Sequence, residues 1–180
     1  MTATLEILAT PFAASDLRQL ESLLRDCVRA GASIGFLVGV TEEEAQAYWA
    51  KVAADAAAGA KLVLVARDAS GAIIGSAQLA LESRANGRHR AEVQKVMVRP
   101  ECRRHGIARR LMAELEAQAQ ARGVWLLFLD TSDSHAGARQ LYEALAYTYV
   151  GGIPDYATNP QGEPEPNAIF YKRLPRTAAG

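Results

Sequence analysis

Residues 93–112, VQKVMVRPECRRHGIARRLM, decide the fold of this chain. The first half is rich in valine, which is typical of a buried strand, and Pro100 ends that strand because proline cannot donate to a sheet ladder. The second half places Ile107, Leu111 and Leu115 four residues apart, which predicts a helix with one apolar face. The stretch therefore predicts a strand, a short cationic turn and a helix that begins beside Gly106.

The turn between this strand and this helix has the properties of a phosphate site. A helix N-terminus offers backbone N–H groups without intrahelical partners and carries a partial positive charge. Gly106 has no side chain, so the backbone there can come close to a ligand. Arg103, Arg104 and Arg109 add positive potential. The turn is either a pyrophosphate cradle or an ordinary helix start with solvated arginines. The Walker and dinucleotide phosphate-binding motifs are absent from the sequence, so those two kinds of phosphate loop are not indicated.

Patterns elsewhere predict further helices and strands in a mixed order. Ser15 is expected to cap one helix that stops at Gly31, and Thr41 with Glu44 forms a capping box for a second. A further helix is expected over 136–145. Strands are expected over 5–8, 62–66, 73–81, 92–98, 124–129, 147–150 and 168–171. Asn86-Gly87 is typical of a hairpin turn, and 154–166 forms a long loop.

Two motifs in order carry a resemblance to a known family. Arg103-x-x-Gly106-x-Ala108 resembles the Q/R-x-x-G-x-G/A signature of the GCN5-related N-acetyltransferase (GNAT) superfamily. Downstream, residues 138–147, ARQLYEALAY, are similar to the A-x-x-L-Y-x-x-x-G-F segment of the same superfamily. A narrower likeness, to tabtoxin-resistance acetyltransferases that act on a free amine of a small toxin, is carried by residues 31–36, 90–95, 129–131 and 144–148.

The resemblance implies a fold and a cosubstrate. The expected fold is GNAT-like α/β (α+β), a mixed, mostly antiparallel central sheet of about seven strands flanked by about four helices. Acetyl-CoA is the implied cosubstrate, and His135 stands where many members have an asparagine that contacts it. The residues implied to bind acetyl-CoA are Val96, Met97, Val98, Arg103, Arg104, His105, Gly106, Ile107, Ala108, Arg109, His135 and Tyr142.

Acetyl transfer to an amine requires a base, a donor to the carbonyl oxygen and an acid for the departing thiolate. Glu92 is the first candidate base, and strand alternation predicts that it shares a face with Gln94, Val96 and Val98. The alternative is a solvent-facing glutamate paired with Lys95 or Arg90.

Two more residues complete the candidate chemistry. Asp130 follows the apolar run 124–129 and is either an acceptor contact or a turn or cap residue. The resemblance assigns the acid to Tyr142, and the Val98 amide is the candidate oxyanion donor. Without the motif, Tyr142 would be an ordinary half-buried helix aromatic.

Ser33, Phe36 and Tyr156 are expected to wall the acceptor pocket. Ser33 also lies in the string G-x-S-x-G at 31–35, with Asp130 and His135 following in the order of a serine hydrolase. A nucleophile elbow needs a strand before the serine and a helix directly after it. A helix is predicted before Ser33, so the loop interpretation is favoured.

Composition sets limits on the other classes of function. The 180 residues, 49% of them hydrophobic, predict one domain over 1–174 with a flexible tail at 175–180. Zero net charge gives no sign of a nucleic-acid or membrane partner. No apolar run approaches the ~20 residues that span a bilayer, and no signal peptide is visible. A cytoplasmic protein is expected, and a homodimer is an open alternative to a monomer.

The cysteines and histidines do not indicate a metal site. Cys27 and Cys102 form no C-x-x-C pair, and His89, His105 and His135 share no ligand spacing. The sequence therefore predicts an acetyl-CoA-dependent N-acetyltransferase without a metal, acting on a primary amine of a small molecule by direct transfer. The alternatives are a peptide or protein amine as acceptor, and a non-catalytic acetyl-CoA sensor.

Overall fold

The computed structural model of the protein describes residues 3–133 and 136–176. Its strands are β1 Thr4–Ile7, β2 Lys61–Arg67, β3 Ile73–Leu81, β4 Arg90–Val98, β5 Leu126–Ser132, β6 Thr148–Gly151, β7 Ala157–Thr158, β8 Pro164–Glu165 and β9 Asn167–Arg173. Its α-helices are α1 Ala14–Arg29, α2 Glu42–Ala57, α3 Ile107–Gln120 and α4 Ala136–Ala144, and a 3-10 turn, η1, covers Pro100–Cys102.

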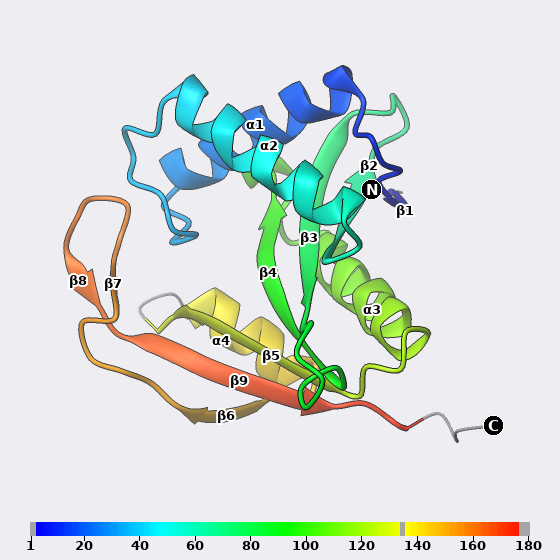
Figure 1. The fold of residues 1–180 in the computed structure, drawn as a ribbon. Coiled ribbons are helices and arrows are strands. Elements are labelled where there is room, and N and C mark those ends of the chain that lie inside the picture. Colours follow the sequence, from blue (N-terminus) through cyan, green and yellow to red (C-terminus); the bar gives the residue numbers. More distant parts are fainter. Residues whose placement is uncertain (1–2, 134–135, 177–180) are drawn as a thin grey trace.

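Seven of the strands form one sheet in the order β1-β2-β3-β4-β5-β9-β6. Every neighbouring pair is antiparallel except β4 and β5, which are parallel. Helices α1 and α2 cover one face of β2–β4 and α3 covers the other, while α4 packs against β5 and β6 (Figure 1). The described part of the chain thus confirms the predicted mixed, mostly antiparallel sheet flanked by helices.

The sheet opens between β4 and β5. These strands pair only over Arg90–Glu92 and Leu126–Phe128, although β4 continues to Val98 and β5 to Ser132. Past Glu92 the two strands spread apart (Figure 1). The backbone groups of residues 93–98 that face β5 therefore have no strand partner on that side.

A bulge in β4 corrects the predicted alternation of its side chains. Across from β3, Gln78 pairs with Gln94 but Ser76 pairs with Met97, so β4 holds one extra residue, and Lys95 there has a φ of 49°. Glu92 and Gln94 do share a face, since their side chains hydrogen-bond. The prediction that Val96 and Val98 share it was wrong, because the extra residue turns them toward the α3 core.

The predicted capping and turn signals were confirmed for α2 but not for α1 or for the β3–β4 connection. Thr41 and Glu44 form the predicted capping box of α2. Ser15 does not cap α1, because the helix begins at Ala14 and its N-cap, Ala13, makes no side-chain bond. Asn86-Gly87 is part of an eight-residue connection, 82–89, instead of a two-residue turn, and the 154–166 loop contains the β7–β8 hairpin.

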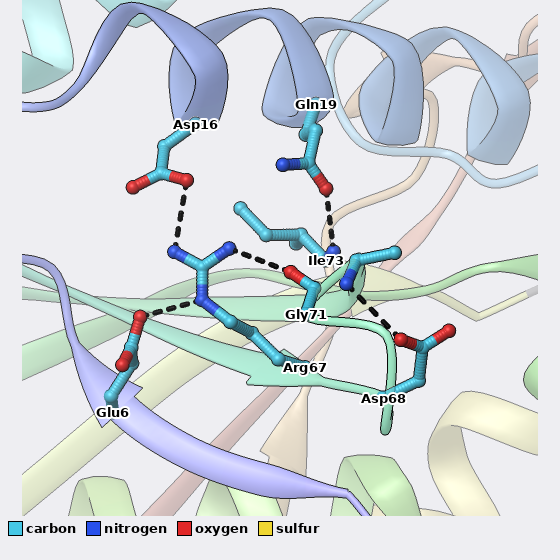
Figure 2. Close-up of polar contacts among 8 residues, drawn as sticks. Glu6, Asp16, Gln19, Arg67, Asp68, Gly71 and Ile73 are labelled. Carbon is cyan, nitrogen blue, oxygen red and sulfur yellow. Dashed lines mark hydrogen bonds and ion pairs between the residues drawn. The ribbon is translucent and has the colours of Figure 1, made fainter.

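Arg67 joins three separate elements near the chain start (Figure 2). Its guanidinium lies 2.6 Å from the Glu6 carboxylate of β1 and 2.9 Å from Asp16 of α1, and it donates to the Gly71 carbonyl at 3.1 Å. Beside it the Gln19 side chain accepts from the Ile73 amide at 2.7 Å. These contacts hold β1 and α1 against the β2–β3 hairpin.

We expect Arg67→Met to lower the free energy of unfolding by about 1–3 kcal/mol, because it leaves the partly buried Asp16 carboxylate short of a donor and removes the links to Glu6 and Gly71. The matched control is Arg84→Met. The Arg84 side chain is 71% exposed against 18% for Arg67, so its loss should leave the free energy of unfolding almost unchanged. Urea unfolding followed by circular dichroism measures both values. Equal losses in the two variants would contradict a structural role for Arg67.

Candidate active site

The gap between β4 and β5 opens into a cavity of about 1220 Å³. Its lining includes most of the residues that the sequence nominated, namely Ser33, Glu92, Val96, Met97, Val98, Arg103, Arg104, Gly106, Ile107, Ala108, Arg109, Asp130, Tyr142 and Tyr156. Phe36 and His105 are not among its lining residues. His135 lies outside the described residues. The strand gap thus brings together residues from both halves of the chain.

The cationic turn lies where β4 leads into α3. Gly106 is the N-cap of α3 with a φ of 76°, and Arg104 is also left-handed with a φ of 63°. The first N–H groups of α3, those of Ile107, Ala108 and Arg109, precede any intrahelical carbonyl they could bond. A Cβ on Gly106 would meet no protein atom within 4 Å, so the space above this residue is open. The donor set and the open approach fit a pyrophosphate.

Tight packing holds this turn against the sheet. A Cβ on Gly75 of β3 would lie 3.2 Å from side-chain atoms of both Ile107 and Leu111, so α3 packs closely on β3 at its first turn. Arg103 donates its Nε to the Val98 carbonyl at 3.3 Å, which ties the turn to the end of β4. The Cys27 thiol contacts the same carbonyl at 3.4 Å. The candidate anion-binding groups are therefore held between the end of a strand and a helix.

Glu92 lies at the closed end of the gap, where β4 and β5 make their last pair. Its carboxylate accepts from the Gln94 side-chain amide at 2.8 Å, and the Gln94 oxygen accepts from Lys61 Nζ at 3.0 Å. Arg90, considered as its ion-pair partner, instead pairs with Glu82 at 2.9 Å. Glu92 is thus oriented by a chain of hydrogen bonds that starts at Lys61 on β2. Its carboxylate still has lone pairs that can accept a hydrogen bond from a further donor.

This chain of hydrogen bonds continues from Lys61 to Gln78 and Tyr48. Lys61 also lies 3.4 Å from the Gln78 oxygen, which accepts from the Tyr48 hydroxyl at 3.1 Å. Burial raises the pKa of Tyr48 to about 12, so its hydroxyl stays a donor. Sequence reasoning missed Lys61, Gln78 and Tyr48, because they come from three elements that only the folded sheet brings together.

Asp130 and Tyr142 enter the cavity from the other strand and from α4. Asp130 lies inside β5 opposite Ile169, so it is neither a helix cap nor a turn residue, and it is exposed to the cavity. Tyr142 is buried against Tyr147 and Phe170. Burial raises the pKa of Tyr142, and the Asp130 charge raises it further, so the phenol keeps its proton. Such a phenol can serve as a proton donor.

Two loops wall the other side of the cavity. Ser33 comes from the α1–α2 connection and Tyr156 from the segment before β7. The Val38 amide donates to the Pro160 carbonyl at 2.8 Å, which joins the α1–α2 connection to the β7–β8 hairpin (Figure 1). Phe36 packs edge-on against Tyr48, their ring centroids 5.3 Å apart, and so supports the wall from behind.

Comparison with known proteins agrees with this arrangement. The model of the acetyltransferase (GNAT) family matches residues 17–147. An uncharacterized N-acetyltransferase from the hisH–hisA intergenic region of Azospirillum brasilense is 34% identical over 121 residues, covering 66% of this chain and 70% of that protein. The chain therefore belongs to the GNAT family and is an acetyl-CoA-dependent N-acetyltransferase, as its motifs predicted. The narrower resemblance to tabtoxin-resistance enzymes gains no support.

Solved structures share the fold at low identity. A phosphinothricin acetyltransferase of Sinorhizobium meliloti in complex with acetyl-CoA has a TM-score of 0.78 at 24% identity, covering 100% of this chain and 93% of that one. An N-acetyltransferase of Staphylococcus aureus has a TM-score of 0.79 at 16% identity, with coverage of 97% and 100%. A ribosomal-protein-alanine N-acetyltransferase of Brucella melitensis has a TM-score of 0.77 at 22% identity, with coverage of 95% and 99%.

Residues 3–133 and 136–176 contain neither a metal-binding cluster nor a membrane-spanning helix. No group of three or more histidine, cysteine, aspartate or glutamate side chains is placed to hold a metal ion there. No helix in that part of the chain is long and apolar enough to cross a membrane.

Proposed function

We propose that the protein transfers an acetyl group from acetyl-CoA to a primary amine of a small molecule, directly and within a ternary complex. The observation that carries the proposal is the position of Glu92 at the closed end of the β4–β5 gap, with the cationic turn following the open end of β4. This geometry provides an anion site and a candidate base along one strand. Acetyl-CoA supplies a thioester whose acetyl group is activated toward amines.

Each residue has a defined task in this proposal. Glu92 accepts, directly or through a water, the proton that the acceptor ammonium must lose before it can attack. The Val98 amide donates to the acetyl oxygen as charge develops there. Tyr142 gives its phenolic proton to the departing thiolate, and its raised pKa ensures that this proton is present. Asp130 attracts the ammonium into the gap.

The walls of the acceptor side favour a small molecule over a protein chain. Ser33 and Tyr156 line this side from two segments next to the Val38–Pro160 hydrogen bond, an arrangement that favours a compact acceptor over a polypeptide. Amino-acid-like compounds and amine-bearing toxins or antibiotics are the acceptors of suitable size. Both cysteines are free and buried, which suits a reducing cytoplasm.

The test measures release of free CoA thiol from acetyl-CoA with a panel of small amines and a matched panel of peptides, with products identified by mass spectrometry. We expect turnover with small amines. Intersecting initial-velocity patterns and no acetylated protein after incubation with acetyl-CoA alone would support direct transfer. Turnover with peptides only would favour the peptide acceptor. Calorimetric binding of acetyl-CoA without any turnover would favour a sensor.

A further inference from the structure

Lys95 occupies the centre of the β4 bulge and lines the cavity. Its φ of 49° is a left-handed conformation that residues with side chains rarely adopt. Its Nζ lies 5.7 Å from the ring centroid of Tyr48 and 6.0 Å from that of Phe36, and 3.4 Å from where a Cβ on Gly35 would be. The ammonium therefore lies under the α1–α2 connection, on the acceptor side of the cavity.

Among the described residues, the Lys95 ammonium has no anionic partner at ion-pair distance. Within residues 3–133 and 136–176, no carboxylate lies within 4.0 Å of its Nζ, whereas the neighbouring Lys61 has Asp55 at 4.0 Å and the Gln94 oxygen at 3.0 Å. The two rings lie near the ~6 Å outer limit of a cation–π contact. A partly buried cation without a partner is costly, so this position favours an incoming anion.

Three carboxylates line the cavity: Glu165, which accepts from the Ser132 hydroxyl, and Glu92 and Asp130, whose charges act on Lys95. Burial lowers the pKa of Lys95, the Lys61 charge lowers it further, and the Asp130 and Glu92 carboxylates raise it. Of the three lysines that line the cavity, Lys51 is exposed and Lys61 lies near Asp55, so Lys95 is the partly buried ammonium with no carboxylate within 4.0 Å among the described residues. A ligand that complements this pattern has a cationic end and an anionic end a short distance apart.

We propose that Lys95 binds an anionic group of the acceptor, so that the acceptor is a small zwitterion whose amine lies close to a carboxylate or phosphonate, as in an α-amino acid. This inference rests on the proposed function, because it concerns the acceptor of the same reaction. The anionic group pairs with Lys95 under the α1–α2 connection, and that pairing directs the amine toward Glu92 and Asp130. Lys95 thus determines specificity without taking part in proton transfer.

The test compares matched acceptors and matched variants. The acceptors are amino acids, their carboxamides, which lack the anion, and the corresponding aminophosphonates. The variants are Lys95→Met, which keeps the length of the side chain and removes its charge, Lys95→Arg, which keeps the charge, and Arg88→Met, which removes an exposed cation of the β3–β4 connection. Circular dichroism and the Kd for acetyl-CoA show that each variant folds and keeps its cosubstrate site.

We expect the wild type to prefer the acid over the carboxamide, and Lys95→Met to raise the KM for the acid by about 10- to 100-fold with little change for the carboxamide. Lys95→Arg should raise the KM for the acid less than Lys95→Met does, and Arg88→Met should leave this KM unchanged. Comparing amino acids with the corresponding aminophosphonates shows whether the preferred acceptor carries a carboxylate or a phosphonate. Equal effects of Lys95→Met on acid and carboxamide, or a wild type that prefers the carboxamide, would overturn the inference.

A binding measurement separates this inference from the proposed function. Amino acids and carboxamides are titrated into the complex with CoA, in the wild type and in Lys95→Met, by ligand-observed NMR. Binding of the acid that Lys95→Met loses supports the inference even where no acetyl transfer occurs. Transfer to carboxamides and simple amines alone would leave the proposed function standing and overturn the role of Lys95. Absence of any acid-selective binding would also overturn it.

Discussion

Replacing Glu92 by Gln should lower kcat/KM by about 100-fold or more and leave the Kd for acetyl-CoA unchanged. The amide has nearly the shape of the carboxylate but cannot take the ammonium proton. Gln94 donates to Glu92 at 2.8 Å, and an amide at position 92 can still accept that hydrogen bond through its oxygen. The local structure should therefore survive, and the loss should appear in turnover.

Asp130→Asn is the matched comparison, because Asp130 is the other carboxylate of the gap that the sequence nominated. It lies on β5 and is exposed, and among the described residues it has no hydrogen-bonded partner such as Glu92 has in Gln94. We expect a loss of about 10-fold, mainly in the KM for the amine, since an attracting charge acts chiefly on binding. Stopped-flow or steady-state thiol release measures both variants. Wild-type turnover in Glu92→Gln together with a collapse in Asp130→Asn would move the base to Asp130.

Gly106→Val should weaken acetyl-CoA binding by about 100-fold or more, as measured by calorimetry. A Cβ at this position meets no neighbouring protein atom within 4 Å, so the side chain would extend from the backbone into open space. It would occupy the open space above the first N–H groups of α3, where a phosphate must approach. The expected loss therefore comes from blocked approach of the ligand.

The same change also strains the backbone, since the φ of Gly106 is 76°. Gly123, just past the other end of α3, provides the control, because it has the same φ of 76° and equally open surroundings. Each valine variant should lose about 1–2 kcal/mol of stability from the left-handed conformation. Only Gly106→Val should lose acetyl-CoA binding. A similar rise in Kd for Gly123→Val would assign the effect to strain in α3 and remove the argument for a cradle.

The parts of the fold that sequence could predict are those specified by neighbours in the chain. The α2 capping box depends on Thr41 and Glu44 alone, and the start of α3 depends on Gly106 and the apolar spacing after it. The bulge at Lys95 was not predictable, because it is defined by a register with β3 that skips one residue. A strand read with a period of two cannot contain that skip.

The same limit applies to the candidate site. Glu92, Asp130 and Tyr142 were nominated by type and motif, and all three line the cavity. The partners that orient Glu92 were missed, because Lys61 lies on β2 and approaches Gln94 only across the assembled sheet. Lys95 stood next to Gln94 in a run of valines, and two adjacent polar residues in a buried strand were the available signal. That signal breaks strict alternation, as a bulge does.

The bulge divides β4 into two segments whose side chains pack against different layers, so each segment is constrained in evolution by different neighbours. Before it, the side chains at 92 and 94 face the α1–α2 layer, and after it the side chains at 96 and 98 face the α3 core. Substitutions that adapt the first segment to a new acceptor therefore need not disturb the packing behind the second. A lineage could change its acceptor through a few residues near the bulge while inheriting the rest of the strand intact. Deleting one residue from the bulge would abolish this independence, because every side chain beyond it would change sides.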